Sequence, residues 1–167
     1  MTKAALAFLT VPALAACSLV TLPPQPLPDV TLTTPLPLVA SGLRLFQEAP
    51  LFPAPVDGRL KNISVTGQAT LSVPASSRVV VDVLLTRDLP VNCLSYGGYR
   101  GCLAGGETVG TVTFEAGQTG ASVLLRGASL TELAHAAQGH LGLMLKEGSL
   151  PANTTVQLTG LRAAATL

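Results

Sequence analysis

Residues 63–73 alternate apolar and small polar side chains, and this alternation limits the fold more than any other feature of the chain. Ile63, Val65 and Leu71 take alternate positions, and serine, threonine or glutamine fills most positions between them. A period of two residues places the two kinds of side chain on opposite faces of a β-strand, one against a core and one toward water. The segment therefore predicts either one long bent strand or an antiparallel pair, buried on one face.

A second strand is predicted over residues 79–85, after a turn at residues 74–77. Val80 and Leu84 add apolar side chains to its second face, on either side of Asp82. Because a strand that is apolar on both faces is covered on both, we expect this one to be central in its sheet.

Four further strands are predicted in the second half of the chain from the same alternation. They cover residues 109–114, 121–125, 141–145 and 154–167. Gly117 and Gly120 lie between the first two and supply the positive φ values of a hairpin turn, so we expect those strands to pair. A change of apolar parity within the last strand predicts a bulge at Gly160.

One short helix is predicted before the strand at residues 141–145. Ser129 and Glu132 have the spacing of a capping box, and Gly139 follows as a stop signal. Many short strands with one brief helix predict an all-β fold, a single antiparallel β-sandwich that is either immunoglobulin-like or jelly-roll. The strand–helix–strand order over residues 121–145 also resembles the late part of jelly-roll modules that bind polysaccharide, which implies that function as an alternative.

The start of the chain has the pattern of an export signal, with Lys3 before an apolar run. The run ends in Leu14-Ala15-Ala16-Cys17. This motif resembles the lipobox of bacterial lipoprotein signal peptides. The resemblance implies that a signal peptide covering residues 1–16 is removed and that Cys17 becomes the acylated first residue, anchored in a membrane of the cell envelope.

Two alternatives to lipidation stay open. Secretion after the Ala-x-Ala site at residues 13–15 would leave Cys17 as a bystander. The leader could instead remain as an uncleaved anchor, since apolar character continues to Leu22, although Pro12 and a length of about 19 residues make a spanning helix marginal.

Residues 17–41 are interpreted as the lipidated cysteine followed by a proline-rich linker, and residues 42–167 as the β-sandwich domain. Proline fixes φ and removes an amide donor, so a segment rich in proline is extended and partly polyproline-like. We therefore expect the linker to act as a spacer that lifts the domain off the membrane.

The charge of the chain is low and balanced. Charged residues make up 11% of the sequence and apolar residues 48%. Ten basic residues face nine acidic ones, and removing Lys3 with the leader leaves nine against nine. A neutral mature protein has no field that would recruit nucleic acid or anionic lipid by charge, so we expect neither as a charge-driven partner.

The three cysteines are an odd number for an exported protein, and lipidation of Cys17 accounts for the odd one. Cys93 and Cys102 then form a pair in an oxidising compartment, where we expect them to be bonded. Two reduced, buried cysteines are the alternative. The eight residues between them do not have a recognised zinc spacing, so we expect no metal site.

Catalytic motifs are not evident in the sequence. The acidic residues are scattered without a paired spacing, and neither a Gly-x-Ser-x-Gly elbow nor a phosphate or dinucleotide loop is present. His135 and His140 are interpreted as exposed residues at the helix end. We therefore expect a protein that is not an enzyme and that needs no cofactor.

The segment from Arg87 to Glu107 is the longest predicted loop, and it carries both tyrosines between the paired cysteines. Long loops in compact domains are usually functional or disordered, and a disulfide argues against disorder. We interpret Tyr96, Tyr99 and Arg100 as a binding surface for another envelope protein, because tyrosine and arginine are enriched at binding hot spots. The alternatives are that the tyrosines merely cover the end of the sandwich, and that the protein is a structural spacer without a ligand.

Overall fold

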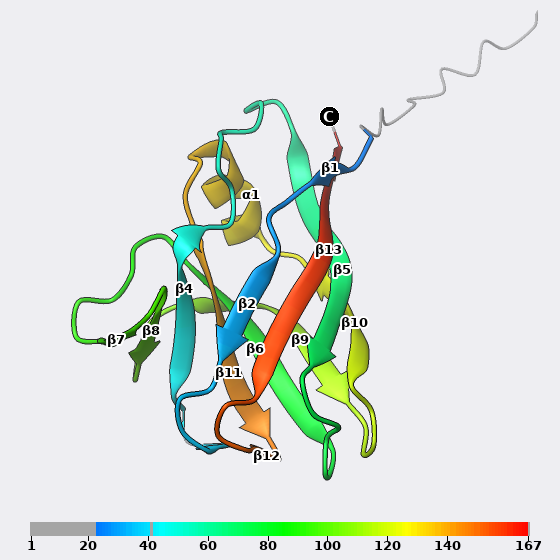
Figure 1. The fold of residues 1–167 in the computed structure, drawn as a ribbon. Coiled ribbons are helices and arrows are strands. Elements are labelled where there is room, and N and C mark those ends of the chain that lie inside the picture. Colours follow the sequence, from blue (N-terminus) through cyan, green and yellow to red (C-terminus); the bar gives the residue numbers. More distant parts are fainter. Residues whose placement is uncertain (1–22, 41, 167) are drawn as a thin grey trace, which may run out of the picture.

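Two antiparallel sheets, packed against each other, form a β-sandwich in the computed structural model, which describes residues 23–40 and 42–166 (Figure 1). The first sheet has the strand order β1 (Gln25–Pro26), β13 (Thr155–Thr166), β5 (Lys61–Leu71) and β10 (Gly120–Leu125), and β2 (Val30–Thr33) also pairs with β13. The second has the order β7 (Leu94–Tyr96), β8 (Tyr99–Cys102), β4 (Arg44–Pro50), β11 (His140–Glu147), β6 (Val79–Thr86) and β9 (Glu107–Phe114). A short pair joins β3 (Leu38–Val39) to β12 (Ser149–Leu150). The predicted all-β sandwich is confirmed.

The core lies between the two sheets and consists of the side chains that the alternation assigned to the inner faces. Ile63, Val65 and Leu71 of β5 are buried there, together with Phe114 of β9 and Leu158 of β13. Burial of a side chain of this size stabilises a fold by about 1.5 to 3 kcal/mol, so the core is the main source of stability.

Strand β6 is buried along nearly its whole length and lies between β11 and β9, as the apolar residues on both its faces predicted. Asp82 on its outer face is 5% exposed and accepts a hydrogen bond of 2.8 Å from Thr111 Oγ1. Lys146 Nζ lies 3.8 Å from the same carboxylate.

Strands β9 and β10 do not form the hairpin that the glycines between them predicted. They belong to different sheets, and residues 115–119 cross from one sheet to the other. Leu71 N donates to Thr119 O, and Gly117 N donates to Ala75 O, so this crossing is tied to the turn after β5. The prediction was wrong because a glycine-rich turn fixes a reversal of the chain but not the partner of the next strand.

The helix α1 (Ala128–His135) is present, but the capping box is not. Gly127 occupies the N-cap position without a side-chain hydrogen bond to the helix, and Ser129 Oγ is buried without a hydrogen-bond partner. The helix is held by burial of Leu130, Leu133 and Ala134 against the sandwich rather than by its cap.

The boundary predicted between linker and domain is wrong, because the fold includes residues well before position 42. Val30 and Leu32 of β2 are 2% and 1% exposed, and β2 pairs with β13. Thr34 Oγ1 donates to Pro151 O and accepts from Thr154 N. The prolines around β2 obscured its alternation. Residues 1–16 and Cys17 lie outside the described residues.

Two smaller expectations concern individual strands. The register of β13 against β5 shifts between Thr159 and Arg162, which confirms the predicted bulge at Gly160. For β4, Pro50, Pro53 and Pro55 predict either an edge strand or an irregular approach to the sheet. The strand lies instead between β8 and β11, with Pro50 as its last residue.

Candidate interaction surface

The connection from β6 to β9 takes a long path although the two strands are neighbours in the sheet. Residues 87–106 leave β6, reach the far edge of the same sheet, form the β7–β8 ribbon beside β4, and return to β9. Figure 1 shows this excursion in green on the left of the molecule. We call residues 87–106 the crossing segment.

A second apolar cluster lies beneath the crossing segment, on the outer face of the second sheet. It consists of Phe46, Leu84 and Cys102, each no more than 2% exposed. Glycine is required where the backbone approaches the ring, since a Cβ at Gly106 would lie 2.8 Å from Phe46 Cζ and one at Gly142 would lie 2.6 Å from Phe46 Cε1. The crossing segment is therefore packed onto the sheet.

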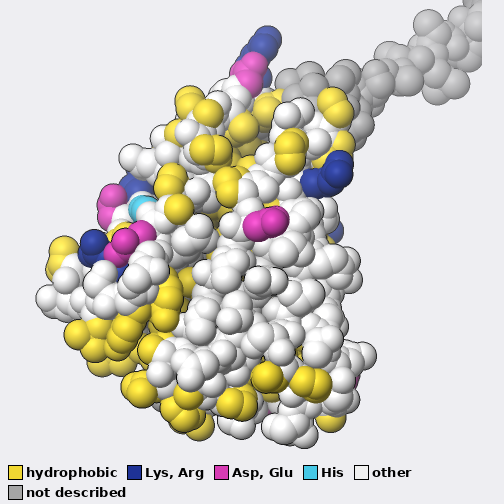
Figure 2. Space-filling model, in the orientation of Figure 1, with side chains coloured by type: hydrophobic (Ala, Val, Ile, Leu, Met, Phe, Trp, Pro, Cys, Tyr) yellow, Lys and Arg dark blue, Asp and Glu magenta, His cyan; other side chains and the backbone are white. Residues whose placement is uncertain are grey.

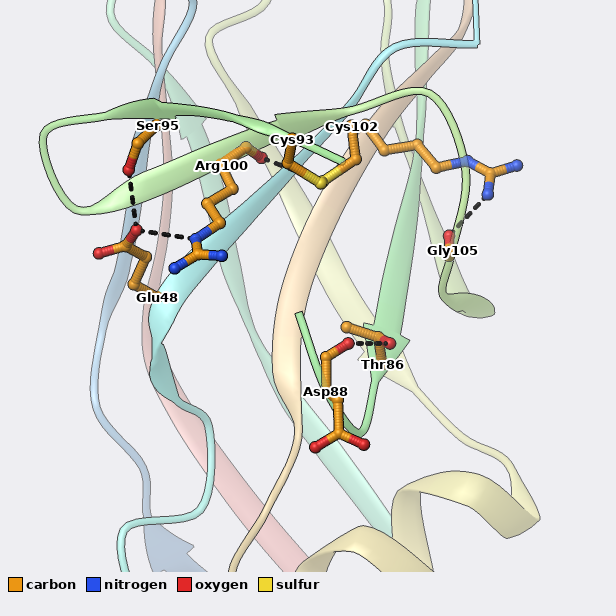
Figure 3. Close-up of a disulfide and its surroundings, with 9 residues drawn as sticks. Glu48, Thr86, Asp88, Cys93, Ser95, Arg100, Cys102 and Gly105 are labelled. Carbon is orange, nitrogen blue, oxygen red and sulfur yellow. Dashed lines mark hydrogen bonds and ion pairs between the residues drawn. A yellow bond between two sulfur atoms is a disulfide. The ribbon is translucent and has the colours of Figure 1, made fainter. Parts of the chain in front are cut away.

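Cys93 and Cys102 have their sulfur atoms 2.04 Å apart, the distance of a disulfide bond (Figure 3). Cys102 is buried against Phe46 and Leu84, and Cys93 is half-buried at the edge of the same cluster. The pairing expected from the cysteine count fits this geometry. The bond closes the β7–β8 ribbon at its base.

Polar contacts hold the ribbon to β4. Glu48 Oε1 accepts from Arg100 Nε at 3.1 Å and from Ser95 Oγ at 3.1 Å, and Glu48 N donates to Gly98 O (Figure 3). The hydrogen bond from Arg100, supported by that from Ser95, lowers the pKa of Glu48. The carboxylate form that accepts both bonds is therefore favoured.

The two tyrosines lie on the inner side of the ribbon. Their rings stack, with centroids 5.7 Å apart, and both side chains are half-buried. A Cβ at Gly101 would lie 3.1 Å from Tyr96 Cε2 and 3.7 Å from Leu45 Cδ2, so Tyr96 covers Gly101 beside the main core. Partial burial raises the pKa of Tyr99.

The three residues predicted as one binding surface are split between two faces. Residues directly opposite each other in an antiparallel pair share a face, and Arg100 is opposite Phe46 whereas Tyr99 is opposite Tyr96. Arg100 therefore points to the outer side, where it bonds Glu48, while the tyrosines cover the edge of the core. This arrangement matches the alternative that the tyrosines pack on the sandwich.

Exposed apolar side chains gather instead on the outer part of the crossing segment. Val91 and Leu103 are 90% and 81% exposed. With Pro90, Asn92, Ala104 and the buried Cys102, they line an open hollow of about 280 Å³, in which Asn92 has the only polar side chain. We call the side chains of Pro90, Val91, Leu103 and Ala104 the loop patch.

Hydrophobic side chains gather on the side of the molecule where the crossing segment lies (Figures 1 and 2). Leu94, 68% exposed, lies on the opposite face of the β7–β8 ribbon from the disulfide. Residue type did not predict these contacts, because valine and leucine are not enriched at binding hot spots. The unusual positions of Val91 and Leu103, between turn residues rather than within a strand, were the available signal.

Histidine, cysteine and acidic side chains are dispersed in the part of the chain that the structure describes. It holds no group of three His, Cys, Asp or Glu side chains arranged to bind a metal ion. His135 Nε2 contacts Leu60 O at 2.8 Å, and His140 Nδ1 contacts Gln47 O at 3.2 Å, so each histidine is engaged with a backbone carbonyl. Within residues 23–40 and 42–166, no helix is long and apolar enough to cross a membrane.

Comparison with known proteins does not add a function to transfer. A scan against protein-family models and a search of curated proteins each returned no match.

Proposed function

We propose that this protein is an envelope lipoprotein, anchored through acylated Cys17, that binds another envelope protein through the loop patch. The observation that carries the binding part is the exposure of Val91 and Leu103 on a covalently closed, packed segment. Isolated exposed apolar residues are common, but a hollow lined by several of them is typical of a contact site.

The construction of the crossing segment supports binding with a low entropic cost. The disulfide, the cluster around Phe46 and the bonds to Glu48 hold the backbone before a partner arrives. Arg44 of β4 also holds the crossing segment to the sheet, because its Nη1 donates a hydrogen bond of 2.6 Å to Gly105 O (Figure 3). A segment that is already ordered loses less conformational entropy on binding, so more of the contact energy appears as affinity.

Polysaccharide binding is the second candidate, and one observation favours it. The outer face of the first sheet carries rows of uncharged polar side chains, such as Thr31, Gln157 and Thr70, which are neighbours across β2, β13 and β5. In Figure 2 this area is largely free of charge. Against it, Phe46, Phe52 and Phe114 are buried, so these aromatic rings form no platform on which a sugar could stack.

The anchor is tested by replacing Cys17. Wild-type protein should incorporate labelled fatty acid and remain with membranes, whereas Cys17→Ala should lose the label and appear in the soluble fraction. Two or more acyl chains are needed for stable attachment, at about 0.8 kcal/mol per buried methylene. A Cys17→Ala protein that stays in the membrane, with no label in the wild type, would contradict the lipoprotein proposal.

The contact surface is tested by photo-crosslinking in intact cells. A photoreactive residue at Val91 or Leu103 should give one adduct of defined mass. In a second experiment the photoreactive residue is placed at Pro90. The double variant Val91→Ser/Leu103→Ser should then lose the adduct that the parent protein gives. The matched control is Leu36→Ser/Val39→Ser, which changes two other exposed apolar residues and should leave the adduct intact. Equal adducts in both double variants would reject the loop patch as the surface.

A further inference from the structure

The fold starts very close to the proposed lipid anchor. Leu27 N donates to Leu161 O, and β1 pairs with β13, so the chain is already part of the sandwich at Gln25. Cys17 lies only six positions before Pro23, the first described residue. At a maximum of about 3.6 Å per residue, this tether spans no more than roughly 22 Å.

An apolar groove lies beside the point where this tether joins the fold. It has a volume of about 150 Å³ and is lined by Pro23, Gln25, Val56, Leu60, Ile63 and alanines 163–165. Among its lining residues only Gln25 has a polar side chain. We call it the tether groove.

The surroundings of the tether groove combine exposed apolar residues with two exposed basic ones, Lys61 and Arg162. Pro53, Ala54 and Pro55 are exposed in the connection between β4 and β5, which Figure 1 shows at the same end as β1 and α1. In Figure 2, hydrophobic side chains gather at this end, around the start of the described chain. Nearby, Asp57 and Arg59 neutralise each other through hydrogen bonds of 2.6 to 3.1 Å.

We propose that the tether-groove end of the domain lies against the lipid bilayer that holds acylated Cys17. This inference rests on the lipid anchor of the proposed function. A tether this short keeps that end of the domain no farther from the membrane surface than the length of the tether. The apolar groove at that end can then bury its surface in the bilayer. The domain is then seated on the membrane rather than lifted from it, in contrast to the spacer expected from the prolines.

A single tryptophan tests the seating, because the chain contains none of its own. Gln25→Trp places the probe at the groove, and Gln118→Trp makes the same exchange on an exposed residue of the connection between β9 and β10, at the opposite end (Figure 1). Each full-length acylated protein is reconstituted into phosphatidylcholine vesicles with brominated acyl chains, which quench tryptophan on contact. Compared with the same vesicles without bromine, we expect the tryptophan emission of Gln25→Trp to fall at least twofold. We expect the emission of Gln118→Trp to stay unchanged.

A charge placed in the groove tests whether its apolar surface makes the contact. Ala164→Glu in the Gln25→Trp protein should restore most of the emission, whereas the matched control Ala116→Glu at the far end should not. Equal quenching of the two tryptophan proteins by the brominated lipid would overturn the inference. Quenching of Gln25→Trp that Ala164→Glu does not relieve would also overturn it.

The mass of the reconstituted protein separates the two possible failures. An acylated protein with unquenched Gln25→Trp emission would refute the seating and leave the lipoprotein proposal standing. A protein without acyl chains on Cys17 would refute the anchor, and the seating with it. Circular dichroism of each variant, matched to the wild type, ensures that the readings refer to the folded domain.

Discussion

Replacing both Cys93 and Cys102 with alanine should lower the free energy of unfolding by about 3 kcal/mol. The two cysteines are separated by nine positions, so the bond closes a ring of about ten residues. In the loop-entropy model such a ring removes about 9 cal/mol/K from the unfolded chain, which is about 2.7 kcal/mol at 25 °C. Loss of the buried sulfur of Cys102 beside Phe46 and Leu84 adds a few tenths to about 0.8 kcal/mol.

Urea denaturation followed by circular dichroism measures this difference. Both proteins carry Cys17→Ala so that neither is acylated, and both are kept free of reductant. For a domain of this size, a loss of about 3 kcal/mol corresponds to a fall in Tm of roughly 10 °C. The unfolded chain without the bond should also be more expanded, so the slope m should rise slightly.

Hydrogen exchange distinguishes global from local effects. No buried residue of the main core belongs to the crossing segment, and Tyr99 only packs against its edge. Amides of β7 and β8 should therefore lose most of their protection, while those of β5 and β13 exchange with the free energy of global unfolding. A double variant whose free energy of unfolding stays within about 0.5 kcal/mol of its parent, with β7 and β8 still protected, would refute the ring-entropy reasoning.

Three other perturbations have expected outcomes. Gly142→Ala should cost about 1 to 3 kcal/mol in urea denaturation, because the new Cβ meets the buried Phe46 ring; a neutral result would mean that the ring can move. Arg100→Ala should raise the pKa of Glu48, followed by NMR titration, because it removes the main bond to the carboxylate; an unchanged pKa would contradict that cause. Gly160→Ala should lower the free energy of unfolding by about 1 to 2 kcal/mol, because φ is +59° at a position with open space around it. Gly160→Asn should lower it less, because asparagine adopts positive φ more readily. Equal losses in the two variants would mean that backbone strain is not the cause.

Side-chain periodicity predicted the strands well but not their partners. The alternation around Val65 and the doubly apolar run around Val83 were enough to place β5 and β6 in a sandwich core. The crossing between the sheets after Phe114 could not be predicted, since the turn residues at 115–119 do not determine which strand becomes the partner of the next one. Val30 and Leu32 were assigned to a linker because prolines nearby outweighed a four-residue pattern.

For the candidate surface, composition predicted the cysteine pair but not the exposed side chains. The pairing of Cys93 with Cys102 was predicted because assigning Cys17 to the lipid leaves only these two of the three cysteines. Whether Tyr99 faces the core or solvent depends on the register of β8 against β4, which a tertiary contact sets. Leu103 follows the end of β8, where alternation no longer applies. Residue type alone therefore selected tyrosines that pack on the core.

The crossing segment starts and ends on neighbouring strands, and this makes it an insertion that could be exchanged. Leu85 is directly opposite Glu107, so residues 87–106 could be excised and the two strands joined by a short turn. Phe46 and Leu84 would then need polar replacements, because the insertion is what covers them. The sandwich would thus serve as a scaffold onto which other disulfide-closed loops can be grafted, each delivering a different recognition surface from the same framework.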